Sequence, residues 1–315
     1  MNIVLLESLG VPDAVLNACA KPLTDAGHSF KAYAKNTDPQ VQIEEAKDAD
    51  VIMIANMPLK GKVIRACPNL KYIDVAFTGV DHVDLEAAKA CGVKVSNAAG
   101  YSTQAVAELC LGLMLDLLRN VPQVAERCRS GGTKDGLVGT ELSGKTVGIV
   151  GVGAIGTRVA ELCHAFGCKV LGNKRHVTGQ EPAFIEFVPL DELLERSDIV
   201  SLHTPLNDST KGLINAASIE KMKPGALLVN TSRGPVVDSA ALAAALDSGR
   251  LGGAGIDVFE MEPPVPANHP LLHSKNTIVT PHVAFATAES LEARCKIVFD
   301  NIEQWMAGHQ TNIIL

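Results

Sequence analysis

The sequence predicts an α/β protein with parallel sheets in two domains, and three observations support that class. Short β-branched apolar runs alternate with segments of helical period along the chain, as in parallel sheets covered by helices on both faces. The chain has 315 residues, which exceeds the size at which one hydrophobic core stops growing. Hydrophobic residues form 47% of the chain and charged residues 20%, so there are enough apolar side chains for two cores.

The expected strands are short, apolar and rich in β-branched residues. In chain order they are Asn2–Leu6, Val51–Ile54, Tyr72–Val75, Lys94–Ser96, Thr146–Val150, Lys169–Leu171, Ile199–Leu202, Ala226–Asn230, Gly253–Val258 and Thr277–Thr280. Helical spacing of apolar residues predicts the helices Leu190–Arg196, Asn215–Met222, Ser239–Ser248 and, in the tail, Ala288–Met306. A charged, glycine-rich segment at 129–145 is expected to be a loop.

A long helix marks the expected boundary between the domains. From residue 105 to residue 118 the apolar side chains form a wide stripe at helical spacing, and Ser102 and Thr103 precede it as candidate N-caps. We therefore place the boundary near Ala98–Tyr101. A helix that is apolar on several sides needs burial on more than one of them.

The charge balance argues against a nucleic-acid partner. The chain carries 28 Lys and Arg against 35 Asp and Glu, a formal net charge of -7, and no basic cluster marks a surface for polyanions.

The cysteines and the apolar segments bound the expected location. The eight cysteines are scattered and form no CxxC pair, so we expect reduced thiols and no metal site. The start, MNIVLLES, lacks a basic region and has too short an apolar run for a signal peptide. The most apolar segment, 105–118, is interrupted by Glu108 and Asp116, so no membrane span is expected. A cytoplasmic protein is the expectation.

The run TVGIVGVGAIG carries a glycine fingerprint between a predicted strand and a predicted helix. In this pattern Gly151 permits a tight turn, Gly153 lets the backbone approach a pyrophosphate, and Gly156 allows close packing of helix on strand. The pyrophosphate would bind at the N-terminus of the helix, at Ala154 and Ile155. A purely structural turn, or a site for another nucleotide, is the alternative.

The next strand ends without the acid that usually holds the ribose 2′-hydroxyl of NAD. Asn173, Lys174 and Arg175 follow the strand, and the next carboxylate, Glu181, comes only after a turn-like segment. Cationic side chains can bind a 2′-phosphate, which a carboxylate would repel. This favours NADP(H) over NAD(H); the alternative is that both cations are ordinary solvated side chains.

Polar residues follow the later strands, at the edge where open parallel sheets bind ligands. They are His203, Thr204 and Pro205, then Thr231, Ser232 and Arg233, then Asp257 and Glu262, and finally His282. An Arg can bind a carboxylate and a keto oxygen, and an imidazolium beside a carboxylate can protonate a forming alkoxide. This set suits hydride transfer to a 2-keto acid. Position alone leaves Asp257 and Glu262 as equal candidates for the partner of His282.

With these motifs in order, the sequence resembles the D-isomer-specific 2-hydroxyacid dehydrogenase family. The motifs are GVGAIG (151–156), SLHTPL (201–206), MKPGALLVNTSRGPVVD (222–238), GIDVFEMEPP (255–264) and TPHVA (280–284), extended by NAAGYSTQAVAE (97–108) and FTGVDHVDL (77–85). The resemblance implies two Rossmann-like, doubly wound domains with the active site in the cleft between them. It makes 1–98 plus 284–315 the substrate-binding domain and 99–283 the dinucleotide-binding domain.

The resemblance also implies roles for single residues. Arg233 would orient the substrate, His282 would be the acid/base with Glu262 as its partner, and Asp257 would hold the nicotinamide carboxamide. The loop of Ala76, Phe77, Thr78 and Gly79 would bind the substrate carboxylate through backbone N–H groups, and Phe77 replaces the more usual glycine, which narrows the pocket. The other cofactor contacts would be Thr103, Gly151, Gly153, Ala154, Ile155, Gly156, Asn173, Lys174, Arg175, His203, Thr204, Pro205, Thr231, Ser232 and His282.

The resemblance implies a homodimer that reduces a small 2-keto acid, with hydroxypyruvate or glyoxylate favoured because relatives without the acid after the second strand commonly reduce them. Glu262 argues against a formate dehydrogenase, in which a Gln takes that place. The absence of a GxSxG elbow argues against a hydrolase. A nucleotide-sensing corepressor on the same fold, which is a binding protein and not an enzyme, remains the alternative.

Overall fold

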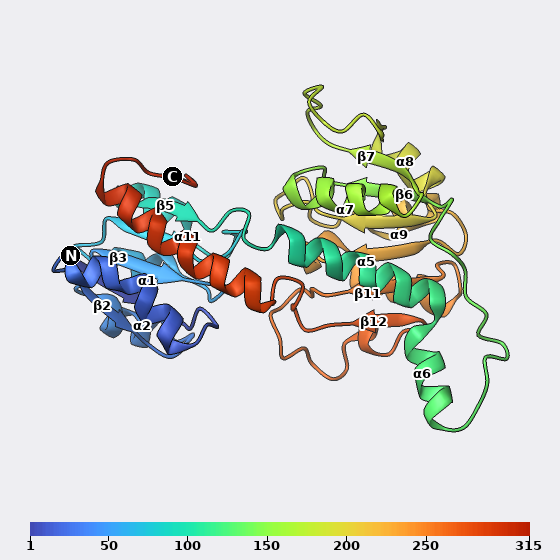
Figure 1. Ribbon diagram of the computed structural model, residues 1–315, viewed down its shortest axis with the longest axis horizontal. Helices are drawn as coiled ribbons and strands as arrows, with labels where there is room; N and C mark the ends of the chain where they lie inside the picture. Colours follow the sequence, from blue (N-terminus) through green and yellow to red (C-terminus); the bar gives the residue numbers. More distant parts are fainter. The chain divides into compact units, whose positions relative to one another are not determined.

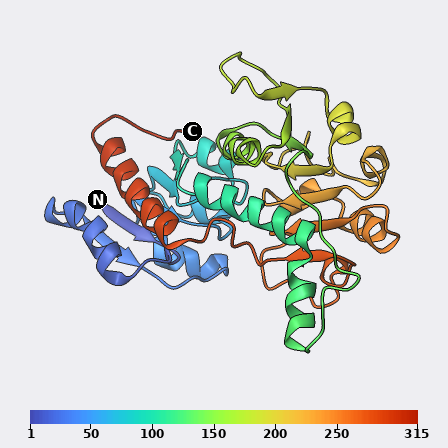
Figure 2. The ribbon, with the colours of Figure 1, turned by 45° about the vertical axis from the view of Figure 1, so that its right-hand side comes forward.

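The computed structural model describes all residues, 1–315, and they form two compact units (Figures 1 and 2). The first unit comprises Met1–Ser102 and Ala286–Leu315, and the second comprises Thr103–Phe285. The boundaries therefore fall two to four residues later than expected. At the first boundary this is because Tyr101 belongs to the first unit, where its ring packs on Phe77 with 6.2 Å between centroids.

The first unit is a five-stranded parallel sheet in the order β2-β1-β3-β4-β5. Its strands are β1 (Asn2–Leu5), β2 (Ser29–Ala32), β3 (Val51–Ile54), β4 (Tyr72–Val75) and β5 (Lys94–Asn97). Its helices are α1 (Asp13–Asp25), α2 (Pro39–Ala46), α3 (Gly61–Arg65), α4 (Leu85–Ala90) and α11 (Ala288–Met306). The strand order reverses after β2, so right-handed connections place α1 on one face and α2, α3 and α4 on the other. Helix α11 packs against α1 and β4.

The second unit is a seven-stranded parallel sheet in the order β12-β11-β10-β9-β6-β7-β8. Its strands are β6 (Thr146–Val150), β7 (Lys169–Asn173), β8 (Ile185–Phe187), β9 (Ile199–Leu202), β10 (Leu227–Asn230), β11 (Gly253–Ile256) and β12 (Thr277–Val279). Its helices are α5 (Thr103–Arg119), α6 (Val121–Arg129), α7 (Ala154–Ala165), α8 (Leu190–Arg196), α9 (Ala216–Lys221) and α10 (Ser239–Asp247), with short 3₁₀ turns at Gly234–Val236 and Pro270–Leu272. The order reverses between β6 and β9, which makes the carboxyl ends of these two strands the switch point where ligands bind.

Two apolar clusters cover the two faces of this sheet. One joins α5 and α7 to the sheet, through Cys110 and Val159 packed with Ile149. The other joins α8, α9 and α10 to the opposite face, through side chains that include Leu193 and Leu242. The predicted class, two doubly wound parallel-sheet α/β domains, is confirmed.

Two edge strands differ from the expectation. Strand β2 was not predicted because its four residues, Ser29–Ala32, mix polar and apolar side chains in a short run, and three of them are exposed. Strand β8 has only three residues. Strand β7 also runs on to Asn173, because its pairing with β6 continues to Val150.

No helix combines the length and the apolar character needed to cross a membrane. All eight cysteines are free thiols.

Candidate active site

The glycine fingerprint forms the turn between β6 and α7, at the switch point of the second unit. Gly151 has φ +97°, and a Cβ on it would lie 2.6 Å from the carbonyl oxygen of His203. A Cβ on Gly156 would collide with the Gly151 carbonyl group. A Cβ on Gly153, by contrast, would have nothing within 4 Å. Two glycines thus serve internal packing, and Gly153 leaves open space in front of the helix.

Helix α7 begins directly after this space and has no side-chain cap. Gly153 is its N-cap residue, and no side chain accepts a hydrogen bond from the first turn. The first N–H groups of a helix have no partner within the helix, and they carry the positive end of its dipole. The turn therefore fits a pyrophosphate, which Ala154 and Ile155 would bind through their N–H groups.

The cations after β7 are both engaged within the second unit. Lys174 Nζ lies 2.7 Å from Oε1 of Glu181, which also accepts hydrogen bonds from Thr178. The hydrogen bond from Lys174 lowers the pKa of Glu181 most, and the hydrogen bond from the backbone N–H of Thr178 lowers it further. Arg175 is exposed and donates to Ser209 Oγ at 2.8 Å. The turn at Thr178 folds Glu181 back onto Lys174, which the sequence does not reveal.

The exits of β9 and β10 carry the next group of predicted residues. The Thr204 hydroxyl is buried and has no hydrogen-bond partner in the protein. The Thr231 hydroxyl lies 2.9 Å from Cys110 Sγ, which fixes it against α5. Thr103 is the first residue of that helix, and Pro205 follows Thr204 in the loop. A buried hydroxyl without a partner is rare, so Thr204 is a good candidate to contact a bound cofactor.

His203 is half-buried, and its Nε2 lies 2.9 Å from Ser201 Oγ. Burial lowers the pKa of His203 from 6.5 to about 4. The unfolded chain therefore binds more protons between these two pH values, and the free energy of unfolding falls as the pH drops through this window, by about 3 kcal/mol at most.

This shift gives a pH prediction. The His203→Gln variant lacks the titration but keeps a polar end for Ser201. The stability of the wild type relative to this variant should therefore decrease between pH 7 and about pH 4.5. Urea unfolding of both proteins at the two pH values measures the difference. A difference that does not vary with pH would contradict the assignment.

A buried Asn that sequence analysis missed shapes the exit of β10. Asn230 Oδ1 accepts hydrogen bonds from Ser232 N (3.0 Å) and Ser232 Oγ (2.8 Å), and its Nδ2 donates to the Arg233 carbonyl at 3.0 Å. A Cβ on Gly234 would collide with the Phe259 backbone. The backbone of Arg233 is thereby held on both sides. The available signal was the polar end of an otherwise apolar strand, LLVN.

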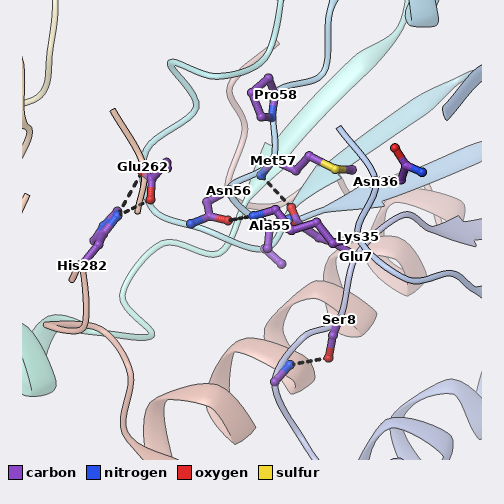
Figure 3. A network of polar contacts seen from close by, with 12 residues as sticks. Glu7, Ser8, Lys35, Asn36, Ala55, Asn56, Met57, Pro58, Glu262 and His282 are labelled. Atoms are coloured by element: carbon purple, nitrogen blue, oxygen red, sulfur yellow. Dashed lines mark hydrogen bonds and ion pairs between the residues drawn. The ribbon is translucent and has the colours of Figure 1, made fainter. Parts of the chain in front are cut away.

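His282 follows β12 and is paired with Glu262, which follows β11 (Figure 3). Its Nδ1 lies 3.0 and 2.9 Å from the two carboxylate oxygens of Glu262. The His282 side chain is 10% exposed and that of Glu262 is 49% exposed. His282 also has φ +56°, an uncommon backbone conformation for a residue with a side chain. The partner of the imidazole in this structure is thus Glu262 and not Asp257.

Asp257 holds the loop that carries His282. It is fully buried, and its carboxylate accepts hydrogen bonds from Thr280 Oγ1 (2.6 Å), Val283 N (2.8 Å) and Ala284 N (2.9 Å). Burial raises the pKa of Asp257. These three donors belong to the segment on either side of His282, so this carboxylate fixes the strained backbone there.

In the first unit, only part of the predicted anion-binding loop has available N–H groups. Ala76 N donates to Ile54 O and Phe77 N donates to Val75 O, each at 2.7 Å. The N–H groups of Thr78 and Gly79 donate to no group in the protein. Of the four residues expected to bind the substrate carboxylate, only Thr78 and Gly79 therefore have N–H groups that are not used inside the protein. The Phe77 ring is buried between Tyr101 and His82.

A glycine turn and an uncapped helix at the switch point of a doubly wound sheet define a dinucleotide-binding protein. Arg233, Glu262 and His282 follow three neighbouring strands of that sheet, β10, β11 and β12, at the edge where such sheets bind ligands.

The chain belongs to the D-isomer-specific 2-hydroxyacid dehydrogenase family, and it is a nicotinamide-dependent enzyme of that family. Residues 111–284 match the family's NAD-binding domain. The chain is 37% identical over 302 residues to the glycerate dehydrogenase of Methylorubrum extorquens, covering 91% of this chain and 92% of that protein. It is 35% identical over 289 residues to the hydroxypyruvate reductase of Blautia hydrogenotrophica, covering 88% of each. Among solved structures, an acyclic imino acid reductase in complex with NADPH and D-Arg has a TM-score of 0.91 at 30% identity, with 100% of both chains covered.

Proposed function

We propose that the protein reduces a small 2-keto acid to the D-2-hydroxy acid, reversibly. The observation that supports this most directly is the contact between His282 Nδ1 and the Glu262 carboxylate beside the exit of β10, which carries Arg233. Because Nδ1 is directed to Glu262, Nε2 is the nitrogen that exchanges a proton with the substrate.

The residues divide the chemistry as follows. The glycine turn before α7 and Thr204 would hold the nicotinamide coenzyme, which would supply or accept the hydride. The Arg233 guanidinium binds the carboxylate and the keto oxygen of the substrate and so aligns the carbonyl carbon. His282 donates its proton to the oxygen as the carbonyl becomes an alkoxide, and Glu262 stabilises the imidazolium before the transfer. In the reverse direction His282 takes the hydroxyl proton.

We assign the substrate-binding role to the first unit and propose hydroxypyruvate or glyoxylate as substrate. The N–H groups of Thr78 and Gly79, which donate to no group in the protein, suit the carboxylate of such a substrate. The relatives named glycerate dehydrogenase and hydroxypyruvate reductase agree with a small hydroxylated acid.

Initial rates test the function. Hydroxypyruvate, glyoxylate and pyruvate are each supplied with NADPH and with NADH, and the loss of reduced nicotinamide is followed. Turnover is expected with hydroxypyruvate or glyoxylate, and in the reverse direction with D-glycerate but not with L-glycerate. Tight coenzyme binding without turnover of any keto acid would reject the proposed keto-acid reduction and favour the nucleotide-sensing alternative.

For the coenzyme we propose NADP(H), with Arg175 and not Lys174 as the 2′-phosphate ligand. The last residue of β7 is Asn173 and not an acidic residue, and its side chain donates to Val188 O. Arg175 contacts only a serine hydroxyl among the protein's side chains, and a phosphate is a stronger partner for a guanidinium.

We also propose that the enzyme is a homodimer. Helix α6 buries none of its residues within the chain, and Val121 and Val138 in this region are 44% and 76% exposed. A second copy that covers this helix would remove these apolar side chains from water. Light scattering after gel filtration should give twice the 33.2 kDa of one chain at micromolar concentration. A single-chain mass there would contradict the proposal.

A further inference from the structure

Three successive carbonyl groups of the loop after β4 are each held by a donor from the same unit. Ala76 O accepts from Arg294 Nη1 (3.3 Å), Phe77 O from Ala98 N (3.1 Å), and Thr78 O from Asn97 Nδ2 (2.7 Å). In a trans peptide the N–H of the next residue points opposite to the carbonyl group. The donors on Phe77 and Thr78 therefore direct the N–H groups of Thr78 and Gly79 away from the body of the unit.

Arg294 connects this loop to a second loop. The side chain comes from α11 and is buried, with 4% exposure, and its Nη2 donates to the carbonyl of Leu9, which follows β1. Strands β1 and β4 are not neighbours, because β3 lies between them. One guanidinium thus joins the exits of two separated strands, with Tyr101 5.7 Å from its centre.

Glu7, just after β1, supplies negative charge to the same edge of this sheet. Its Oε1 accepts from Ala55 N (2.8 Å) and Met57 N (2.7 Å), beyond the end of β3, and Lys35 Nζ lies 3.4 Å from Oε2 (Figure 3). A buried charge is retained in a fold only where it is paired or fully hydrogen-bonded. Arg294 and Glu7 together therefore fix the loops after β1, β3 and β4.

Asn97 is itself fixed on both sides. It is the last residue of β5 and is buried; its N–H donates to Asn312 O at 3.1 Å and its carbonyl accepts from Asn301 Nδ2 at 2.9 Å. The side-chain amide is therefore held in place to donate to Thr78 O. The hydrogen bond of 2.7 Å is the shortest of the three that hold the loop.

We propose that Arg294 and Asn97 are positioning residues that hold the N–H groups of Thr78 and Gly79 in place for the substrate carboxylate. This inference rests on the proposed function, since it assigns the carboxylate of a 2-keto acid to these two groups. Neither side chain need touch the substrate. Without either side chain the loop carbonyls can rotate. Substrate binding then weakens, and coenzyme binding does not change.

The test compares Arg294→Met, Arg294→Lys and Asn97→Ala with the wild type. Arg294→Met removes both carbonyl contacts at similar length, Arg294→Lys keeps the charge and one donor, and Asn97→Ala removes a single hydrogen bond. Arg250→Met is the matched control, since Arg250 also donates to two backbone carbonyls, those of Glu220 and Met222, at the C-terminal end of α9 in the second unit. The readouts are KM and kcat for the best keto acid, the inhibition constant of oxalate, the Kd of the coenzyme, and Tm.

Arg294→Met and Asn97→Ala should raise KM and the oxalate inhibition constant by about tenfold, with kcat within about threefold of the wild type and coenzyme Kd unchanged. In Arg294→Lys, KM and the oxalate inhibition constant should lie between those of the wild type and of Arg294→Met. Arg250→Met should change only Tm. A lower Tm with unchanged KM and oxalate inhibition in the Arg294 and Asn97 variants would overturn the positioning role and leave the proposed function intact. A wild type that neither reduces keto acids nor binds oxalate would reject both.

Discussion

Replacement of His282 by alanine should lower kcat for keto-acid reduction by about 10²–10⁴-fold. In the proposed mechanism the imidazole protonates the alkoxide, and without it the proton must come from water. The Kd of the reduced coenzyme should stay within a few-fold of the wild-type value, because the glycine turn at β6 and α7 is untouched. Steady-state rates and fluorescence titration with coenzyme measure the two quantities.

His273→Ala is the control for this variant. His273 belongs to the same unit, and its Nε2 contacts the carbonyl of Ala267. It should keep near-normal turnover. Near-normal turnover in His282→Ala as well would remove His282 from the mechanism.

Replacement of Arg175 by serine should weaken NADPH binding by about tenfold to a hundredfold and leave NADH binding unchanged. The reason is that only NADPH carries a 2′-phosphate, and Arg175 is the cation after β7 that is not paired with a carboxylate. Fluorescence titration with each coenzyme gives the two dissociation constants. An equal change in both, or in neither, would reject Arg175 as the phosphate ligand.

Lys174→Met separates the two cations. Lys174 is bound to Glu181, so its removal should loosen the turn at Thr178 and leave the ratio of NADPH to NADH affinity within a few-fold of the wild-type ratio. A change in this ratio as large as that in Arg175→Ser would indicate that Lys174 also binds the 2′-phosphate.

The sequence predicted the class of fold and most of the strands because buried parallel strands are continuous apolar runs. It failed for β2 and β8, which lie at sheet edges and need few apolar residues. The structure has Arg233, Glu262 and His282 in the segments after β10, β11 and β12, which could be expected because the carboxyl edge of a parallel sheet is readable from strand order.

Contacts between side chains and turns were not predictable in the same way. The pairing of Lys174 with Glu181 depends on how the intervening turn folds, and a linear sequence shows only that seven residues separate them. The choice between Glu262 and Asp257 as partner of His282 likewise depended on the rotation of each side chain. The N–H groups of Ala76 and Phe77 donate to backbone carbonyls, and this could not be predicted because it depends on how the local turn folds.

The backbone conformation of His282 implies that stability and catalysis place different demands on this position. A residue with a side chain at φ +56° costs about 1 kcal/mol or more, whereas glycine adopts it without penalty. Selection for folding alone would therefore favour glycine here, whereas the proposed role of His282 in turnover would retain the imidazole. A lineage that lost the reaction but kept the fold as a nucleotide-binding protein would be free to lose the histidine at this position before it lost the glycines of the turn.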